Sequence, residues 1–253
     1  MKKKKGNYIT LLLFLILLAG LSLLLYPSVS DYWNSLHQTR AIATYAEEVA
    51  NLNQDQYDEI WAAAESYNAS LPDRVNAYLL SDAQKEEYQQ LLNVSGLGVM
   101  GYIEIPAIDV RLPIYHGVGE DSLNRGAGHM PSTSLPVGGK GTHAVISAHT
   151  GMASSRMFTD LEQLETGDVF HIHVLEETLT YTVDQILVVK PYQTDALKID
   201  AEQDYVTLVT CTPYGVNSHR LLVRGHRTGQ TTELPTDADD RNPEIVLENA
   251  PKQ

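Results

Sequence analysis

The sequence predicts an all-β barrel or sandwich that is preceded by a helical region and a membrane-spanning helix. Two observations predict the β-domain: short apolar runs after about residue 96, and the Gly- and Pro-containing turns that separate them. A third observation, one long apolar run near the N-terminus, predicts the membrane helix. Apolar types form 43% of the 253 residues, which supplies one sizeable core and excludes a chain that is disordered throughout.

The N-terminal segment is the candidate membrane helix. Residues 9–25 are almost entirely apolar, and Tyr8 and Tyr26 flank them as aromatic residues of the kind found at membrane interfaces. Residues 2–5 are all lysine and no acid occurs among the first thirty residues, so we expect a cytoplasmic N-terminus and an exported remainder. The run is longer than a typical signal-peptide core, which favours a retained anchor, while the small residues 28–30 leave cleavage open as the alternative.

Two helices are expected between the membrane segment and the β-domain. Residues 31–69 carry apolar side chains at helical spacing, and Pro72 interrupts that pattern. Residues 73–92 repeat the pattern as a second helix. The stretch 95–98, which contains Ser and two Gly residues, then marks a domain boundary.

Seven short runs are expected to form the strands of the β-domain. In one of them Leu179, Tyr181 and Val183 alternate with polar residues, the period-two pattern of a half-buried strand. The runs are 99–105, 112–115, 143–149, 170–175, 179–189, 205–212 and 220–224. The one helix expected among them is short, at 157–164, and the polar residues from Thr228 onward are expected to form a disordered acidic tail.

Charge and cysteine content exclude several classes of function. Without the lysines at 2–5 the chain carries 14 basic and 32 acidic residues, and so acidic a body repels phosphate backbones; we expect no nucleic-acid partner. The single cysteine, Cys211, excludes an internal disulfide, a CxxC redox pair and a cysteine-rich zinc site. His171 and His173 share one face of a strand, but no third ligand lies nearby in the sequence, so we expect no metal site.

Cys211 is the candidate nucleophile. It ends the apolar run 205–211 and precedes a turn with Pro and Gly, which places its side chain at a barrel rim that substrate can reach. A small buried hydrophobe is the alternative, and the export of a lone cysteine favours a chemical role. A thiol becomes a thiolate near neutral pH only beside a base or a cation.

Histidines and one arginine are the candidate partners of the thiol. His149 lies where the run 143–149 meets a loop, while His219 flanks a strand and His116 lies in a Gly-rich loop. Position alone leaves these three histidines as candidates for the base and favours His149 slightly. Arg220 begins the strand nine residues after Cys211, and a short hairpin would return it beside the thiol, where a guanidinium could hold an oxyanion or orient a carbonyl.

These segments resemble the sortase family. Residues 207–211, Thr-Leu-Val-Thr-Cys, are similar to the Thr-Leu-x-Thr-Cys signature of sortases, and residues 147–151, Ser-Ala-His-Thr-Gly, are similar to their histidine segment. Arg220 falls where the sortase arginine follows the cysteine. From about residue 101 to 227 the chain resembles class C, the pilin-polymerising group. The resemblance implies an eight-stranded sortase-type β-barrel and selects His149 among the histidines.

The resemblance also implies a reaction. Such an enzyme cleaves the Thr–Gly bond of an LPxTG-like sorting signal in a pilin or surface protein, and in class C a pilin lysine accepts the acyl group. Cys211 would form the thioacyl intermediate, His149 would serve as general acid and base, and Arg220 would stabilise the oxyanion or position the signal. The chemistry requires no metal or organic cofactor. The residues expected to contact substrate beside them are Thr210, Leu208 and Ala148.

The chain departs from the class C pattern in two places. No Asp-Pro-aromatic lid occurs between residues 31 and 98, which leaves open whether the helical region covers the site. Residues 228–253 are polar where the group commonly has a C-terminal membrane span, so attachment would rest on the N-terminal helix. That topology is closer to sortases that anchor proteins to the cell-wall peptide, which is the alternative function. An inactive binding protein is a further alternative, disfavoured by the joint presence of Cys211, His149 and Arg220.

The expected organisation has five parts. We expect a single-pass protein of the cell membrane with its catalytic domain outside the cytoplasm. The parts are a cytoplasmic N-terminus (1–7), a transmembrane signal anchor (8–26), a helical region (27–95), a catalytic domain (96–227) and an acidic tail (228–253).

Overall fold

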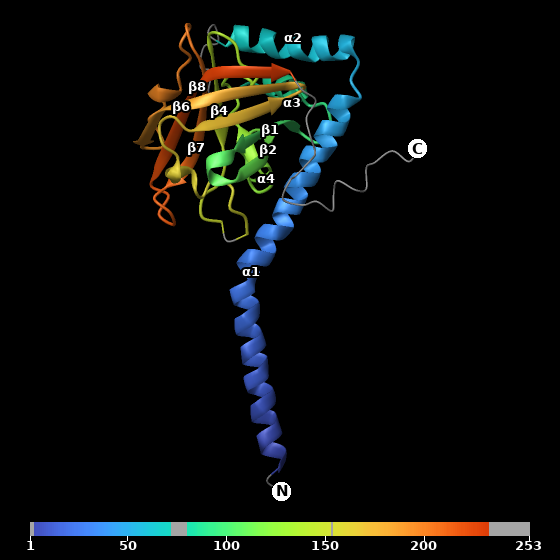
Figure 1. Ribbon diagram of the computed structural model, residues 1–253, viewed down its shortest axis with the longest axis vertical. Helices are drawn as coiled ribbons and strands as arrows, with labels where there is room; N and C mark the ends of the chain where they lie inside the picture. The colour runs from blue at the N-terminus through green and yellow to red at the C-terminus, as the bar shows by residue number, and fades with distance from the viewer. Residues whose placement is uncertain (1–2, 72–79, 153, 233–253) are drawn as a thin grey trace.

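The centre of the molecule is a closed eight-stranded β-barrel (Figure 1). It is seen in a computed structural model that describes residues 3–71, 80–152 and 154–232. Around the barrel the strands follow the order β1-β2-β3-β4-β7-β8-β6-β5. Their bounds are Val99–Ile105 (β1), Val110–His116 (β2), Ala127–His129 (β3), Thr142–Ser147 (β4), Val169–Val174 (β5), Glu177–Val189 (β6), Asp204–Thr212 (β7) and His219–Thr232 (β8). The expected barrel is therefore confirmed.

Two of the strand pairs are parallel, and one of them positions the site. β2 pairs with β3 and β4 pairs with β7 in parallel, while the other neighbours are antiparallel. In the β4–β7 pair Ser147 lies opposite Val209. Because parallel strands end at the same side of a sheet, the C-terminal ends of β4 and β7 meet at one end of the barrel. We call this the active-site end.

Each of the seven expected runs coincides with a strand, although the runs 143–149 and 170–175 extend one or two residues beyond the ends of β4 and β5. The other differences between prediction and structure have local causes. β3 was not expected, because it is only three residues long and contains a glycine. The helix expected at 157–164 is wrong: turns occupy this stretch, followed by a 3₁₀ helix at Leu161–Gln163. Its apolar side chains, such as Phe158 and Leu161, are buried from a connecting segment, so their helix-like spacing reflects burial alone. A one-turn helix, α4 (Glu120–Leu123), was not expected.

The N-terminal helix, α1 (Lys3–Ala50), is continuous from the apolar run to the barrel. Among the described residues it is the one helix long and apolar enough to cross a membrane. We expected the anchor to end at residue 26 and a separate helix to cover 31–69. Instead α1 passes through Pro27 and ends at Ala50, and α2 (Gln54–Ser70) follows.

Capping explains where the later helices begin. The Asn53 side chain accepts a hydrogen bond from the Gln56 N–H (2.9 Å) and the Gln56 side chain accepts one from the Asn53 N–H (3.1 Å), a reciprocal cap that starts α2. Ser81 and Gln84 form the same arrangement at the start of α3 (Asp82–Gln90). The second helix expected at 73–92 therefore begins later; residues 72–79 lie outside the described part of the chain.

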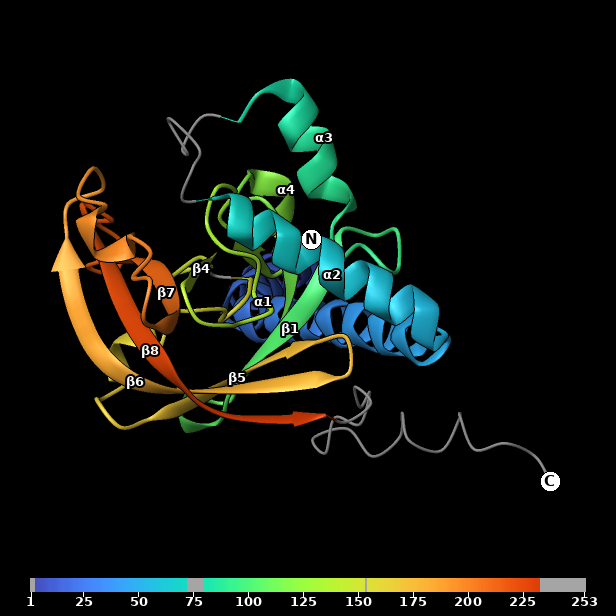
Figure 2. The ribbon, with the colours of Figure 1, turned by 90° about the horizontal axis from the view of Figure 1, so that it is seen from above.

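Helices α1, α2 and α3 lie together beside one side of the barrel (Figure 2). Ile42, Tyr45 and Val49 of α1 enter the core. The Tyr45 hydroxyl donates to the Met100 carbonyl (3.3 Å) and accepts from the Leu175 N–H (2.6 Å), and burial raises its pKa. The C-terminal half of α1 is thus fixed to the barrel, and its N-terminal half is the apolar run.

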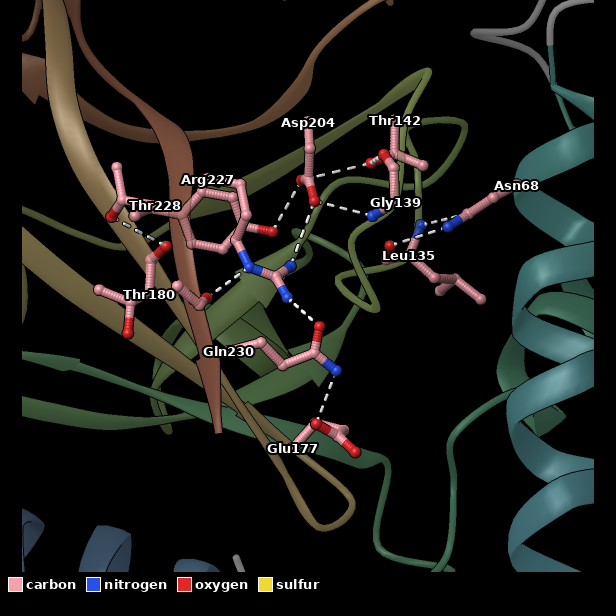
Figure 3. Close-up of polar contacts among 12 residues, drawn as sticks. Asn68, Leu135, Gly139, Thr142, Glu177, Thr180, Asp204, Arg227, Thr228 and Gln230 are labelled. Atoms are coloured by element: carbon pink, nitrogen blue, oxygen red, sulfur yellow. Dashed lines mark hydrogen bonds and ion pairs between the residues drawn. The ribbon is translucent and has the colours of Figure 1, made fainter. Parts of the chain in front are cut away.

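Polar contacts attach α2 to the barrel and join β7 to β8 at the distal end, which lies opposite the active-site end (Figure 3). Asn68 of α2 pairs with both backbone groups of Leu135, donating to its carbonyl (3.1 Å) and accepting from its N–H (2.7 Å). Arg227 of β8 forms an ion pair with Asp204 of β7 (3.1 Å). β8 extends to Thr232 and pairs with the start of β6, so the expectation that the tail begins at Thr228 is wrong. Residues 233–253 lie outside the described residues.

Candidate active site

Cys211 and Arg220 are held opposite each other by the β7–β8 hairpin. Cys211 is the last residue but one of β7, Arg220 is the second residue of β8, and the two are Cα partners in the antiparallel register. Side chains of directly opposed residues project from the same face of a sheet. The hairpin therefore brings the thiol and the guanidinium to one face, as the nine-residue separation predicts.

His149 reaches the same place from β4. It lies two residues beyond Ser147, where β4 ends. The Ala148 N–H donates to the Val209 carbonyl (3.2 Å), and the Thr210 hydroxyl donates to the Ala148 carbonyl (2.9 Å). These two bonds fasten the segment that leads into His149 to the strand that carries Cys211.

A cavity of about 350 Å³ contains all three residues. Cys211, His149 and Arg220 line it together with Ala148 and Thr210. The thiol is neither fully buried nor fully exposed. The remaining walls come from distant segments, mainly Val118, Leu123, Met130 and residues of the connection between β6 and β7 such as Pro191 and Leu197. These wall residues could not be recognised from the sequence, because only the closure of the barrel brings them together.

Leu208 does not belong to this cavity. Its side chain is 0% exposed and packs in the barrel core. Alternation along β7 directs Leu208 inward and Val209 outward, and Val209 packs in a separate small cluster with Val145 and Leu222. The expectation that Leu208 contacts substrate is therefore not supported, and Val209, which lines the cavity, takes its place.

Arg220 is not neutralised by a carboxylate in the described part of the chain. Its guanidinium donates to two carbonyl oxygens of its own hairpin, those of Asn217 (3.2 Å) and His219 (3.1 Å). The neighbouring Arg224, in contrast, makes a bidentate ion pair with Asp184 (both contacts 2.9 Å), which raises the Arg224 pKa. Arg220 is thus oriented by backbone groups and keeps its full positive charge for an anion in the cavity.

The other candidate histidines have different environments. The His116 and His129 rings both pack against the Tyr88 ring of α3. Burial lowers the pKa of each histidine, that of His129 to about 4. His219 is on β8 opposite Thr212, and its Nδ1 lies 2.9 Å from the Ser218 hydroxyl. Neither His116 nor His219 lines the cavity with Cys211.

His171 and His173 form no metal cluster with acidic or sulfur ligands among the described residues. His173 Nε2 lies 3.3 Å from a Glu104 carboxylate oxygen, and this hydrogen bond lowers the pKa of Glu104. The His173 ring also stacks on Tyr102. The pair thus belongs to a polar strand face.

A larger cavity, of about 940 Å³, adjoins the first. It lies under the C-terminal end of α2 and is lined by Asn68, Ser132, His143 and others, and Met130 and Leu197 border both cavities. None of the candidate catalytic residues lines it. No described residue of the helical region lines the smaller cavity either, so within the described residues α1, α2 and α3 do not cover Cys211.

Comparisons with known proteins agree on one family. A sortase domain model matches residues 103–228. Sortase C1 of Streptococcus agalactiae is 44% identical, with a TM-score of 0.72, over 75% of this chain and 98% of that one. A sortase C of Streptococcus pneumoniae, whose structure was analysed for pilin substrate specificity, is 42% identical, with a TM-score of 0.68, over 75% of this chain and 97% of that one. A curated relative, sortase A of Streptococcus agalactiae, is 26% identical over 80% of this chain and 77% of its own.

Proposed function

The chain belongs to the sortase family of cysteine transpeptidases, and on this premise we propose that it cleaves an LPxTG-like sorting signal between Thr and Gly and joins the signal to a pilin lysine. One observation carries the proposal: Cys211, His149 and Arg220 reach a single cavity from β7, the end of β4 and β8. A nucleophile, a proton carrier and a fixed cation are the groups that acyl transfer needs.

The first half of the reaction forms a thioester. The Cys211 thiolate attacks the threonine carbonyl carbon, and the carbonyl electron pair moves onto oxygen as an oxyanion that Arg220 stabilises. The tetrahedral intermediate then breaks its C–N bond. His149 donates its proton to the departing glycine amine, which leaves the threonine bound to Cys211 as a thioester and His149 neutral.

The second half regenerates the enzyme. A neutral lysine amine attacks the thioester carbonyl, again through an oxyanion beside Arg220, and His149 accepts the proton that the amine loses. The C–S bond breaks, Cys211 leaves as thiolate, and the product is an isopeptide between threonine and lysine. The reaction consumes no cofactor because one amide bond is exchanged for another.

The proposal that a pilin lysine is the acceptor rests on the degree of similarity to class C enzymes. Identity to the two sortase C structures is 42–44% across nearly their whole length, whereas identity to the curated sortase A is 26%. The second candidate, attachment of proteins to the cell-wall peptide, is supported by that curated relative and by the N-terminal membrane helix. We propose in either case a single-pass membrane protein with residues 96–227 outside the cytoplasm.

Intact-mass spectrometry of the full-length chain in detergent micelles tests this function. With a sorting-signal peptide, we expect an adduct of the threonyl fragment on Cys211 that passes to a pilin lysine. Cys211→Ala should form no adduct, and Cys211→Ser is the matched variant, in which a hydroxyl of similar size replaces the thiol. Resolution by a cell-wall peptide amine alone would favour the anchoring function, and the same adduct on Cys211→Ala would contradict the assignment of the nucleophile.

A further inference from the structure

We propose that the active-site end of the barrel faces the bilayer that α1 enters, and that the rim around Cys211 rests in the lipid headgroup layer. The inference deepens the proposed function and rests on its membrane topology. It names the interaction surface, which consists of the β7–β8 loop and the turns of α1 that follow the apolar run. The partner is the surface of the same bilayer.

The C-terminal part of α1 contacts the distal end of the barrel. At one end of their contact, Tyr45 bonds to Met100 at the start of β1 and to Leu175 just after β5. Those strand termini are at the distal end, because β5 and β1 are antiparallel neighbours and β1 runs from the distal end toward the active-site end. Figure 1 shows α2 and the end of β8 at this same end, remote from the N-terminus.

At its other contact α1 holds the loop that follows His149. The Asn34 side chain donates to the Ser154 carbonyl (2.7 Å), and the Asp31 carboxylate accepts from the Arg156 N–H (2.9 Å). Both partners belong to the connection between β4 and β5, and the Phe158 N–H in that connection donates to the His149 carbonyl (3.0 Å). Toward its N-terminus α1 therefore passes the active-site end last and then continues into the apolar run.

Helix geometry sets the height of this contact above the bilayer. Eight residues separate Tyr26, the last residue of the membrane segment, from Asn34. At 1.5 Å per residue they span about 12 Å along the helix axis. The polar layer on each side of the hydrocarbon core is roughly 5–8 Å thick, and tilting of the helix shortens the vertical distance further. The loop behind His149 thus lies at or just above the headgroup layer.

Side chains at this end suit a membrane surface. On α1, Trp33 is 63% exposed, and Tyr32 and Val29 are equally exposed. In the β7–β8 loop, Tyr214 is 65% and Val216 is 68% exposed. Residues 213–218 of this loop include no acid, lysine or arginine, although the chain as a whole is strongly acidic. Exposed Trp and Tyr residues are typical of membrane interfaces, and on α1 the adjacent Asp31 carboxylate accepts a hydrogen bond from the Arg156 N–H.

The consequence concerns the kind of substrate. A polypeptide tethered in the same bilayer would bring its sorting signal to Cys211 without leaving the headgroup layer. The two-dimensional confinement would raise the effective concentration of such a substrate at the cavity. A freely diffusing peptide would gain nothing from the arrangement.

Depth-dependent quenching tests the position of the barrel and needs no turnover. In the full-length Cys211→Ala chain, reconstituted in vesicles with bromine-labelled lipids, Val216→Cys would carry a fluorophore. Leu97→Cys is the matched control, because Leu97 is also exposed (54%) but precedes β1 at the distal end. We expect quenching of the label at 216 and none at 97. Equal, weak quenching at both positions would overturn the proposal.

Fluorescence of the two tryptophans of the chain distinguishes a wrong position of the barrel from a wrong assignment of the membrane helix. Trp61→Phe leaves Trp33, near the membrane segment, as the sole reporter, and Trp33→Phe leaves Trp61 of α2. Quenching of Trp33 without quenching at 216 would mean that α1 enters the bilayer and the barrel stands away from it. Absence of Trp33 quenching would reject the proposed membrane helix and the inference with it.

Turnover of a membrane-tethered substrate tests whether the position of the barrel affects catalysis. Val216→Asn should lower turnover of a vesicle-anchored sorting peptide about fivefold, the order expected when one valine is lost from an apolar contact. The same variant should leave turnover of the soluble peptide unchanged, and Leu97→Asn should change neither. An equal loss on both peptides would place Val216 in the catalytic machinery and overturn the proposal.

Discussion

The hydrogen bond between Thr210 and Ala148 links the cysteine strand to the histidine segment, and its removal should affect catalysis more than folding. The Thr210 hydroxyl donates to the Ala148 carbonyl at 2.9 Å, and both residues are buried at 5% exposure. Thr210→Val keeps the shape of the side chain and removes the donor. The Ala148 carbonyl then loses its partner at a largely buried position.

The magnitude follows from that burial. A hydrogen bond of this kind contributes about 0.5–1.5 kcal/mol net, and a buried acceptor left alone costs about 1–3 kcal/mol. We expect Thr210→Val to lower the free energy of unfolding by about 1–2 kcal/mol. Because Ala148 directly precedes His149, the segment that positions the histidine loses one of its hydrogen bonds, and a displacement of about 1 Å can cost on the order of a hundredfold in rate.

Urea unfolding and turnover of a sorting-signal peptide measure the two effects. Thr210→Ser is the matched control, since it keeps the hydroxyl and loses only a methyl group; it should retain most of the activity. Wild-type turnover in Thr210→Val would refute the positioning role. An equal loss in Thr210→Ser would show that packing of the methyl group, and not the hydrogen bond, supports His149.

Three further predictions test other parts of the structure. Arg220→Lys should lower turnover about a hundredfold or more, since a lysine cannot reproduce the fixed guanidinium. The free energy of unfolding should change by less than about 0.5 kcal/mol. A large fall in both quantities, measured by the same two assays, would show that Arg220 is structural. Asn68→Ala removes both bonds to Leu135 and should lower the free energy of unfolding by about 2–4 kcal/mol, with turnover retained below the unfolding transition. Asn68→Asp keeps the acceptor but places a carboxylate oxygen against the Leu135 carbonyl, so it should lose no less stability. The pKa of His129 is about 4 in the folded protein against 6.5 for a free imidazole, so the unfolded chain binds the proton first and stability should fall by about 3 kcal/mol from pH 7 to pH 4. His129→Gln should flatten this slope in urea titrations at several pH values, and an unchanged slope would exclude His129 as its source.

Local pattern predicted much of the fold because it acts through near neighbours. Alternation and turn residues located every strand with a substantial apolar run, whereas β3 was too short to produce a pattern. The same reasoning failed at 157–164, where burial of a connecting segment imitated helical spacing. It also failed at the end of α1, since the break depends on the reciprocal cap of Asn53 and Gln56 and not on a proline.

The candidate site shows the same division. Sequence position left His149, His116 and His219 open, and resemblance to a family selected among them. In the structure His149 shares a cavity with Cys211, and the other two do not. For Leu208, the family motif gave no information on the direction of the side chain, which the alternation of β7 turns into the core.

The sequence by itself determined the composition of the protein's parts: one apolar helix able to span a membrane, a β-domain, and a single cysteine at the end of a strand. These properties depend on residues that are near one another in the sequence, so local patterns are enough to predict them. Only the tertiary structure decided that β4 and β7 run in parallel, that His149 shares a cavity with Cys211, and that α1 passes the active-site end of the barrel on its way to the apolar run. Such contacts join residues that are far apart in the sequence, 62 positions for Ser147 and Val209 and 120 for Asn34 and Ser154. They depend on barrel closure, which minimises exposed apolar surface and unpaired strand edges for the whole chain at once.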